Sequence, residues 1–393
     1  MKKVVITSAK RTPIGSFGGA LSIISASQLG SIAIKAVIED SGINPELVDE
    51  VIFGNVLTAG QGQAPARQAA IFAGLPAKTE CMTINKMCGS GLKAVMLAQQ
   101  AIQNGDAEII VAGGQESMSS APYILDKARS GYRLGDGLIV DSMIKDGLWD
   151  VYNNIHMGNC AEACAKDFKF TQEELDEFAI NSYKKAIDAQ RSGKFKAEIV
   201  GVKIKDKKGE SVVDTDEEPG KVNFEKISSL KPVFDKNGVV TAANASSIND
   251  GAAALLVMSE EKAKDLKLKP LVEIVAQSSA ARAPIEFTTA PTDAINKVLL
   301  KAGLKIWEID LFEINEAFAV VSLANNKLLG LDPSKINVNG GAVALGHPIG
   351  ASGARILVTL IYEMIKRASK YGLASLCIGG GEASALIVKN SNI

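Results

Sequence analysis

Hydrophobic and polar residues change their pattern twice along this chain. In residues 1–118, short apolar runs alternate with segments whose apolar residues recur every three or four positions. Such runs predict strands, and the three-to-four spacing predicts helices with one buried face. The strands are expected at 4–7, 51–53, 82–84 and 108–112, and the helices at 29–37 and 92–102. This alternation is typical of a layered α/β fold.

The last part of the chain repeats the alternation. Strands are expected at 271–276, 311–313 and 374–378, and helices at 292–302 and 355–367. The buried strands at 108–112 and 374–378 both end in a cluster of glycines, which indicates two related α/β halves. The uncharged, glycine-rich stretch 336–354 is interpreted as loops.

The middle part of the chain is more charged and loses its periodicity outside 172–191, which predicts one amphipathic helix. We interpret it as an insertion over the core, where binding loops tend to lie. Three domains are therefore predicted. They are an N-terminal α/β half of residues 1–118 with 249–270, an inserted loop domain of residues 119–248, and a C-terminal α/β half of residues 271–393.

Charge and composition exclude several classes of protein. Lysine and arginine total 43 against 44 aspartates and glutamates in 393 residues, so no whole-protein field attracts nucleic acid or an anionic membrane. Residues 1–11 do not resemble a secretory signal, and the longest uncharged stretch, 12–34, is too rich in glycine and serine for a membrane span. The odd number of cysteines, five, without framework spacing, argues against a disulfide scaffold. The lack of a Cys-x-x-Cys pair and the presence of only two histidines argue against a structural zinc site. A cytoplasmic protein is expected.

Cys88 lies between a predicted strand end and a predicted helix start, with Gly89 and Gly91 beside it. Backbone N–H groups at a helix start stabilise a thiolate and can also hold an oxyanion. Cys88 is therefore a candidate nucleophile. The alternative is a small buried cysteine packed by glycines, which is common in protein cores.

Three further candidates occupy loops at predicted strand ends. His347, between Gly346 and Pro348, has the side chain that most often acts as a general base near neutral pH. Cys377 is a candidate acid or base, and Asn315 could orient a water or a carbonyl. The alternatives are a loop histidine bonded to backbone, a core cysteine and a helix-capping asparagine. Together the four residues supply a nucleophile, a base, an acid and an oxyanion donor.

Over its whole length the chain resembles the thiolase family. The resemblance lies in the order and separation of four loops, which read Cys88-Gly89-Ser90, Asn315-Glu316-Ala317-Phe318, Gly346-His347-Pro348 and Cys377-Ile378-Gly379. It implies a thiolase fold of class α/β, in which two related βαβαβαββ halves form a layered αβαβα core with an inserted loop domain. It also implies a homo-oligomer, expected to be a tetramer.

The resemblance assigns a role to each catalytic position. Cys88 would take an acyl group as a thioester, and His347 would accept its proton and later polarise the second thioester carbonyl. Cys377 would remove the α-proton of the second acyl-CoA. Asn315 would hold a water that completes one oxyanion hole with His347. The backbone N–H groups of Cys88 and Gly379 would form the other hole, and no metal or prosthetic group is required.

The resemblance also implies that the insertion recognises CoA thioesters. The residues expected to shape the acyl, pantetheine and nucleotide sites are Leu148, His156, Met157, Lys221, Phe234, Ala242, Ser246 and Phe318. For Met157 and the two phenylalanines the alternative is core packing, and for His156 it is a structural hydrogen bond within a loop.

Three short segments depart from the family pattern. Gly220 stands where many short-chain members carry an arginine near the CoA nucleotide, so Lys221 is expected to substitute as a point charge. The chain reads 242-AANASS-247 where Gly-Asn-Ala-Ser-Gly is usual. Glu382 follows the third glycine of 379–381, where it is expected to raise a nearby thiol pKa.

The activity implied is acetyl-CoA C-acetyltransferase, the reversible condensation of two acetyl-CoA molecules to acetoacetyl-CoA. The main alternative is a degradative 3-ketoacyl-CoA thiolase acting on longer chains. A decarboxylating condensing enzyme with a Cys-His-His site would need both His156 and His347, and the loops of Asn315 and Cys377 argue against it. A catalytically silent acyl-CoA-binding protein is the remaining alternative.

Overall fold

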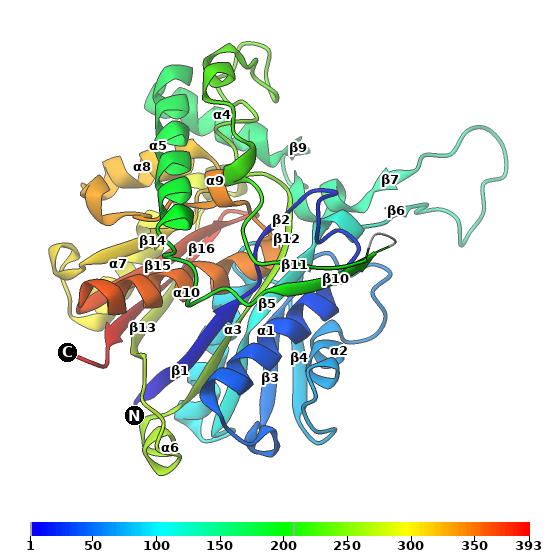
Figure 1. Ribbon diagram of the computed structural model, residues 1–393. Helices are drawn as coiled ribbons and strands as arrows, with labels where there is room; N and C mark the ends of the chain where they lie inside the picture. The colour runs from blue at the N-terminus through cyan, green and yellow to red at the C-terminus, as the bar shows by residue number, and fades with distance from the viewer. Residues whose placement is uncertain (1, 207–208) are drawn as a thin grey trace.

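The computed structural model describes residues 2–206 and 209–393, and its centre is a continuous path of paired strands (Figure 1). The strand order is β14-β15-β16-β13-β1-β12-β5-β3-β4, with β2 paired to β12. The strands of the N-terminal half are β1 Val4–Arg11, β2 Gly15–Ser16, β3 Glu50–Gly54, β4 Glu80–Ile84, β5 Ile109–Ser117 and β12 Asn249–Ser259. Those of the C-terminal half are β13 Val272–Ala281, β14 Leu311–Ile314, β15 Tyr371–Ile378 and β16 Glu382–Asn390. The halves join where β1 meets β13 through two residue pairs.

Helices cover both faces of each half. The helices α3 Ser90–Asn104 and α10 Ile349–Arg367 share one hydrophobic cluster with strands of both halves, so they form a central layer. On the outer faces lie α1 Ala26–Ser41 and α2 Pro65–Phe72 in the N-terminal half, and α7 Ala290–Ala302 in the C-terminal half. The layers therefore run αβαβα, which confirms the predicted layered fold. In the C-terminal half, a single bridge between Phe312 and Ile336 lies beside β14.

Glycine contacts bring the two central helices unusually close. A Cβ on Gly91 would lie 2.7 Å from the Ala354 nitrogen, and one on Gly353 would lie 2.4 Å from the Leu92 nitrogen. The interpretation of residues 336–354 as loops is therefore wrong in part. The segment contains α9 Ala342–Leu345 and the start of α10. Its glycines allow close packing here, whereas glycine usually indicates a turn.

The insertion contains two long helices and three short hairpins. The helices are α4 Met157–Phe168 and α5 Gln172–Arg191, the second with the predicted bounds. They pack through Ala161 and Leu175 against Ala319 and Val320 of α8 Ala319–Leu329 in the C-terminal half. The hairpin strands are β6 Tyr123–Ile124, β7 Val140–Asp141, β8 Trp149–Asp150, β9 Ile155–His156, β10 Val202–Asp206 and β11 Gly209–Val213. The β6–β7 hairpin leaves the body of the molecule as a long arm (Figure 1).

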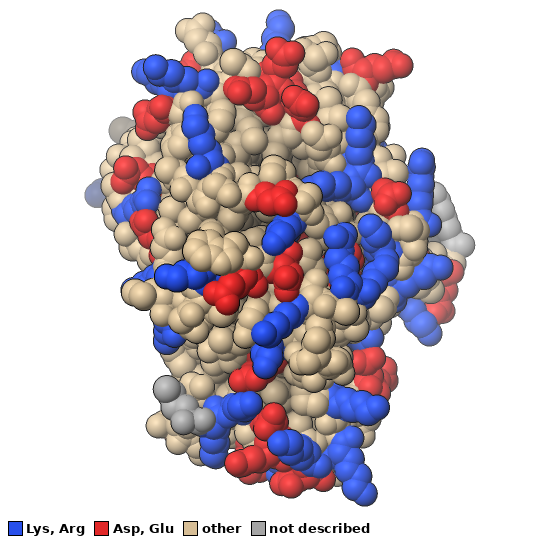
Figure 2. All heavy atoms as spheres, turned by 90° about the vertical axis from the view of Figure 1, so that its left-hand side faces the viewer, with Lys and Arg blue, Asp and Glu red and all other residues tan. Residues whose placement is uncertain are grey.

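The remaining helices are short. They are α6 Glu260–Asp265 and the single-turn or irregular segments Pro45–Leu47, Met118–Ser120, Met143–Leu148, Pro219–Lys221, Phe224–Ser229, Pro284–Thr289, Ile306–Glu308 and Pro333–Lys335. Within the described residues, no helix combines the length and the apolarity that crossing a membrane requires. Positive and negative side chains are interspersed over the face shown in Figure 2.

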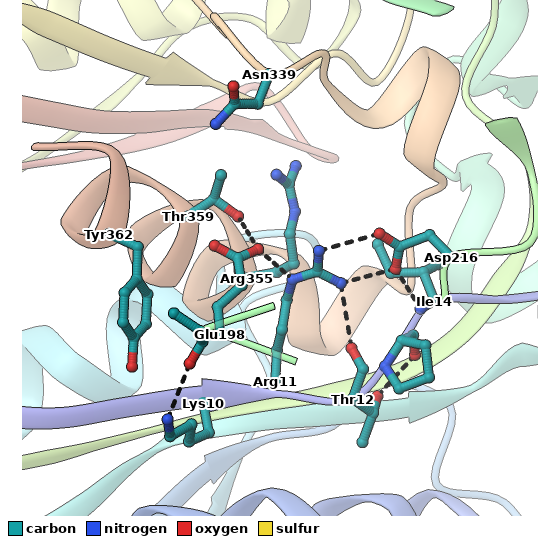
Figure 3. Close-up of polar contacts among 12 residues, drawn as sticks. Lys10, Arg11, Thr12, Ile14, Glu198, Asp216, Asn339, Arg355, Thr359 and Tyr362 are labelled. Carbon is teal, nitrogen blue, oxygen red and sulfur yellow. Dashed lines mark hydrogen bonds and ion pairs between the residues drawn. The ribbon is translucent and has the colours of Figure 1, made fainter. Parts of the chain in front are cut away.

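A buried ionic cluster fastens the insertion to β1 (Figure 3). The Arg11 guanidinium donates to Glu198 Oε1 at 2.6 Å and to both oxygens of Asp216 at 2.7 and 3.0 Å. All three side chains are almost fully buried, and the Phe195 ring lies 5.0 Å from the guanidinium carbon. Because Glu198 and Asp216 belong to the insertion, this cluster fixes the insertion on the core.

Candidate active site

Loops from both halves meet at one end of the central layer. Cys88 lies between β4 and α3, Asn315 directly follows β14, His347 precedes α10, and Cys377 and Gly379 lie at the end of β15. The Gly379 backbone N–H lies near enough to the Cys88 thiol to oppose the rise of the Cys88 pKa. Cys88 in turn lies near enough to Cys377 to raise the Cys377 pKa. Asn315 Nδ2 lies 3.5 Å from His347 Nε2. The structure therefore brings together the five residues predicted to be catalytic.

The hydrogen bonds around His347 define its tautomer. The Ser352 hydroxyl lies 2.6 Å from His347 Nδ1 and 2.9 Å from the Pro348 carbonyl oxygen. Because a carbonyl only accepts, the hydroxyl proton points to Pro348, and Nδ1–H donates to Ser352. His347 Nε2 is then the unprotonated nitrogen. Asn249 Oδ1 accepts from the His347 backbone N–H at 2.9 Å and holds the loop.

The imidazole is neutral in this environment. Burial, together with the positive charge of Arg355, lowers the pKa of His347 from 6.5 to about 3. A neutral imidazole with a free Nε2 lone pair is a proton acceptor. His347 thus has the form that a general base needs.

Both thiols are protonated at neutral pH. Burial raises the pKa of Cys88 to about 11, although the backbone N–H groups of Gly379 and Cys88 oppose that shift. Burial, and the neighbouring Cys88, raise the pKa of Cys377 well above 9. A thiol at this site therefore needs a base to accept its proton before it acts as a nucleophile.

Glu382 does not act on the thiols as the sequence predicted. Its carboxylate forms an ion pair with Lys86, which faces it from the loop before Cys88. The carboxylate that raises the Cys88 pKa is Glu116. The prediction was wrong because a nearby cation, invisible in the order of residues, pairs with Glu382.

Glu116, which the sequence patterns did not indicate, is a buried residue that holds two segments of the site together through hydrogen bonds. Its carboxylate accepts from the backbone N–H groups of Val56, Leu57 and Gly350 at 2.8–3.1 Å, and from Asn55 Nδ2 at 2.8 Å. It therefore joins the end of β3 to the first turn of α10, just after His347. Burial raises its pKa to about 7.

Four of the residues predicted to bind CoA thioesters form an aromatic group beside Cys377. The His156 ring stacks on Phe234 with centroids 4.8 Å apart, and Phe318 meets Phe234 edge-on at 6.2 Å. Met157 and Phe318 pack in the same cluster as Cys377. His156 Nδ1 also accepts from the Gly158 N–H and caps α4, so the structural role considered for His156 is present.

The other predicted CoA contacts are more scattered. Ser246 donates its hydroxyl to the Ala317 carbonyl at 2.8 Å, next to Phe318. Leu148 is half-buried at the end of a segment whose Met143 packs in one cluster with Cys88. Ala242 is exposed, and Lys221 contacts Glu217 and Ser16. No polar contact within the described residues joins Lys221 or Ala242 to the aromatic group.

The arrangement supports acyl transfer through a thiol. It combines a thiol beside backbone N–H donors, a neutral histidine with a free nitrogen, a second thiol and an amide. A hollow of about 420 Å³ lies beside Met87 and Gly379, but Cys88, His347, Cys377 and Asn315 do not line it. Among residues 2–206 and 209–393, no group of three or more His, Cys, Asp or Glu side chains is placed to hold a metal ion.

Comparisons with known proteins match almost the whole chain. The family descriptions "Thiolase, N-terminal domain" and "Thiolase, C-terminal domain" match residues 4–261 and 268–390. An acetyl-CoA acetyltransferase of Cupriavidus necator is 57% identical over 391 residues, which cover 99% of this chain and 100% of the relative. The crystal structure of the Bacillus anthracis acetyl-CoA acetyltransferase is 45% identical, with a TM-score of 0.97 over 99% of both chains. The Acat5 thiolase from Ascaris suum, solved in complex with coenzyme A, is 45% identical, with a TM-score of 0.94 over 99% of this chain and 100% of that one.

Proposed function

Because the chain belongs to the thiolase family, we propose that it is an acetyl-CoA C-acetyltransferase, which reversibly condenses two acetyl-CoA molecules to acetoacetyl-CoA and CoA. One structural observation carries the proposal: the Cys88 thiol of one half lies near the Gly379 backbone N–H of the other, which opposes the rise of the thiol pKa. This proximity supports the roles of nucleophile for Cys88 and oxyanion donor for Gly379. The relatives named above for acetyl-CoA favour this substrate over longer acyl chains.

The first half-reaction is acetyl transfer to Cys88. The Cys88 sulfur attacks the thioester carbonyl while His347 Nε2 takes the thiol proton. The N–H groups of Cys88 and Gly379 stabilise the oxyanion. As the carbon–sulfur bond to CoA breaks, His347 returns the proton to the CoA sulfur.

The second half-reaction is carbon–carbon bond formation. The Cys377 proton passes to His347 Nε2, and the Cys377 thiolate then removes the α-proton of a second acetyl-CoA. Nε2–H and a water held by Asn315 stabilise the enolate oxygen. The α-carbon attacks the acetyl group, and Cys88 leaves as a thiolate that recovers the proton from His347. Every group ends in its starting protonation state, without a metal or prosthetic group.

The experiment that tests this proposal is intact-mass analysis after incubation with acetyl-CoA alone, followed by peptide mapping. We expect one added acetyl group on Cys88 in the wild type and none in C88A. An adduct formed only with longer 3-ketoacyl-CoA would establish the degradative alternative. CoA binding without any adduct would establish a silent binder. Activity that survives dialysis against EDTA would support the absence of a metal.

The proposal includes a cytoplasmic homotetramer. The β6–β7 arm exposes Leu134, Leu138 and Ile139, which are 100%, 77% and 68% accessible, and an apolar arm of this kind is typical of a subunit contact. Strand β4 ends the path of strands and offers a second contact. Five free cysteines suit a reducing compartment. Light scattering should give four subunits, and a chain lacking residues 125–138 should give two. A monomer in both would contradict the assignment.

A further inference from the structure

Helix α10 carries polar side chains along one face although it is buried in the central layer. Ser352, Arg355, Thr359 and Glu363 recur at three- or four-residue spacing, and all four are buried. Ser352 holds His347, Thr359 donates to Glu198 at 3.0 Å, and Glu363 accepts from Asn339 at 2.9 Å. Three of these four side chains therefore have a direct hydrogen-bond partner.

Arg355 is the exception. In Figure 3, dashed lines join Arg11 to Glu198 and Asp216, but none reaches Arg355 from the residues drawn. Within the described part of the chain, Arg355 Nε and Nη1 have no hydrogen-bond partner, and neither does Glu313 Oε2. Among the described residues, the one close contact between Arg355 or Glu313 and an oppositely charged side chain is the contact between the two, in which Nη1 lies 3.6 Å from Glu313 Oε2. Leaving a cation so poorly bonded in a core is costly, which calls for a role other than stability.

The Arg355–Glu313 contact closes a ring that passes through the active site. Glu313 lies on β14 two residues before Asn315, so both side chains are on the same face of the strand. Asn315 reaches His347, and His347 reaches Ser352. Ser352 lies one helical turn before Arg355. The ring of contacts therefore runs from Arg355 to Glu313, along the chain to Asn315, then to His347 and Ser352, and back along one turn of α10 to Arg355.

We propose that Arg355 and Glu313 are positioning residues that set the separation of Asn315 and His347. The inference rests on the proposed function, because it assigns the pair to that site. The Arg355–Glu313 contact fixes α10 relative to β14, although neither side chain touches the substrate. A shift of about 1 Å between reacting groups costs on the order of 10²-fold in rate, so such a brace has a large effect.

Charged groups from several elements surround Arg355 and Glu313. Glu313 from β14, Arg11 from β1, and Glu198 and Asp216 from the insertion act on Arg355. Glu316, Glu198 and Lys185 act on Glu313 in addition to Arg355. The Arg355 charge reaches His347 as well and lowers its pKa. Removing that charge should therefore make the imidazole easier to protonate.

The test compares R355M and E313L, which break the contact, with R355K and E313Q, which keep a polar partner. We expect R355M and E313L to lower kcat by about tenfold while KM for acetyl-CoA changes less than twofold. E313Q should recover most of the rate. The control is R367M, because Arg367 pairs with Glu363 at the far end of α10, and its kcat should stay within twofold of the wild type.

A second readout needs no turnover. The chain has two histidines, so selectively labelled protein gives two imidazole signals, and H156N assigns them. In R355M the His347 signal should begin to titrate at a higher pH than in the wild type, whereas R355K should match the wild type. If wild-type protein never acetylates Cys88, the proposed function fails, but this titration still tests whether the Arg355 charge acts on His347.

The outcomes are distinct. Folded R355M and E313L with wild-type kcat and an unchanged His347 titration would overturn the proposal, as would a change in KM alone. If R355M and E313L do not fold, R355K decides, because the shorter lysine side chain keeps the charge but lengthens the contact with Glu313. A loss of kcat in R355K, with the titration of His347 unchanged, supports the proposal, and an unchanged kcat in R355K contradicts it.

Discussion

The two central helices, α3 and α10, both begin at the candidate active site, and each has a serine in its first turn that hydrogen-bonds to the preceding loop. The two serines act on different groups. In the first turn of α3, Ser90 donates to the Met87 carbonyl at 2.7 Å and accepts the Lys86 backbone N–H at 2.8 Å. In the first turn of α10, Ser352 donates to the Pro348 carbonyl and faces the imidazole of His347. One serine therefore shapes a loop, and the other orients a side chain.

The difference follows from the chemistry that each helix presents. A thiol reacts through one atom, so α3 has only to hold the Cys88 loop, and its buried face is almost entirely apolar. An imidazole has two nitrogens with different roles, so its tautomer and its orientation must both be fixed. Helix α10 achieves this with buried polar groups. The proposed nucleophile, Cys88, therefore needs few buried polar groups around it, whereas the proposed base, His347, needs a polar helix face within the core.

Removing each thiol in turn should separate the two half-reactions most strongly. C88A should lose acetylation and lower turnover at least about 10⁴-fold, because the covalent route disappears. C377A should still become acetylated on Cys88 yet fail to condense a second acetyl-CoA. Intact mass and acetoacetyl-CoA formation measure the two steps. Equal acetylation in C88A and C377A would contradict the assigned roles.

The two serines offer a matched pair of substitutions. S352A frees His347 Nδ1 and should lower kcat roughly 10–100-fold, as expected for the loss of a hydrogen bond that orients a catalytic group. S90A should instead slow acetylation of Cys88 and leave the His347 tautomer unchanged, which nitrogen NMR of labelled histidine reports. Identical effects of S352A and S90A on the tautomer would remove the distinction between the helices.

The contact between the helices can be tested through its glycines. In G353A the new methyl group would meet the Leu92 backbone, so the free energy of unfolding should fall by about 1–3 kcal/mol. Denaturant unfolding measures this change. G220A is the control, because no atom lies within 4 Å of a Cβ there, and it should leave stability nearly unchanged. Equal stability of both variants would show that the helices can move apart freely.

The last prediction concerns the pH dependence of the Cys88 thiol and changes no residue. Because burial raises its pKa to about 11, the free thiol should be alkylated by iodoacetamide about tenfold faster per pH unit between pH 7 and 10. Peptide mapping distinguishes Cys88 from the other cysteines. A rate that levels off below pH 8 would mean that Cys88 rests as a thiolate and needs no base.

Sequence patterns predicted many of the elements and the loops that carry the candidate site residues, because both depend on local features. Periodicity identified α5 to the residue, and the glycines around Cys88 and His347 correctly signalled loops. The prediction of a strand end was wrong for His347, whose loop joins the helices α9 and α10. The residues that were missed act across the fold. Asn249 is 98 positions from His347, and Glu116 is 234 positions from Gly350. No local pattern encodes such contacts. The effect of Glu382 on the thiol pKa was predicted wrongly for the same reason, because its partner Lys86 is distant in the sequence.

The position of β12 sets the order in which this protein can fold. Residues 249–259 lie between β1 and β5 and pair with both, yet more than 130 residues of insertion separate them from β5. A nascent chain that ends before Ser259 leaves β1 and β5 as unpaired edges, so the N-terminal sheet cannot close early in synthesis. Strand pairings between segments so distant in the sequence slow folding, and the unpaired strand edges can aggregate until the pairings form. The yield of refolding should therefore fall strongly as the protein concentration rises. This follows because the insertion precedes β12, the strand that closes the sheet.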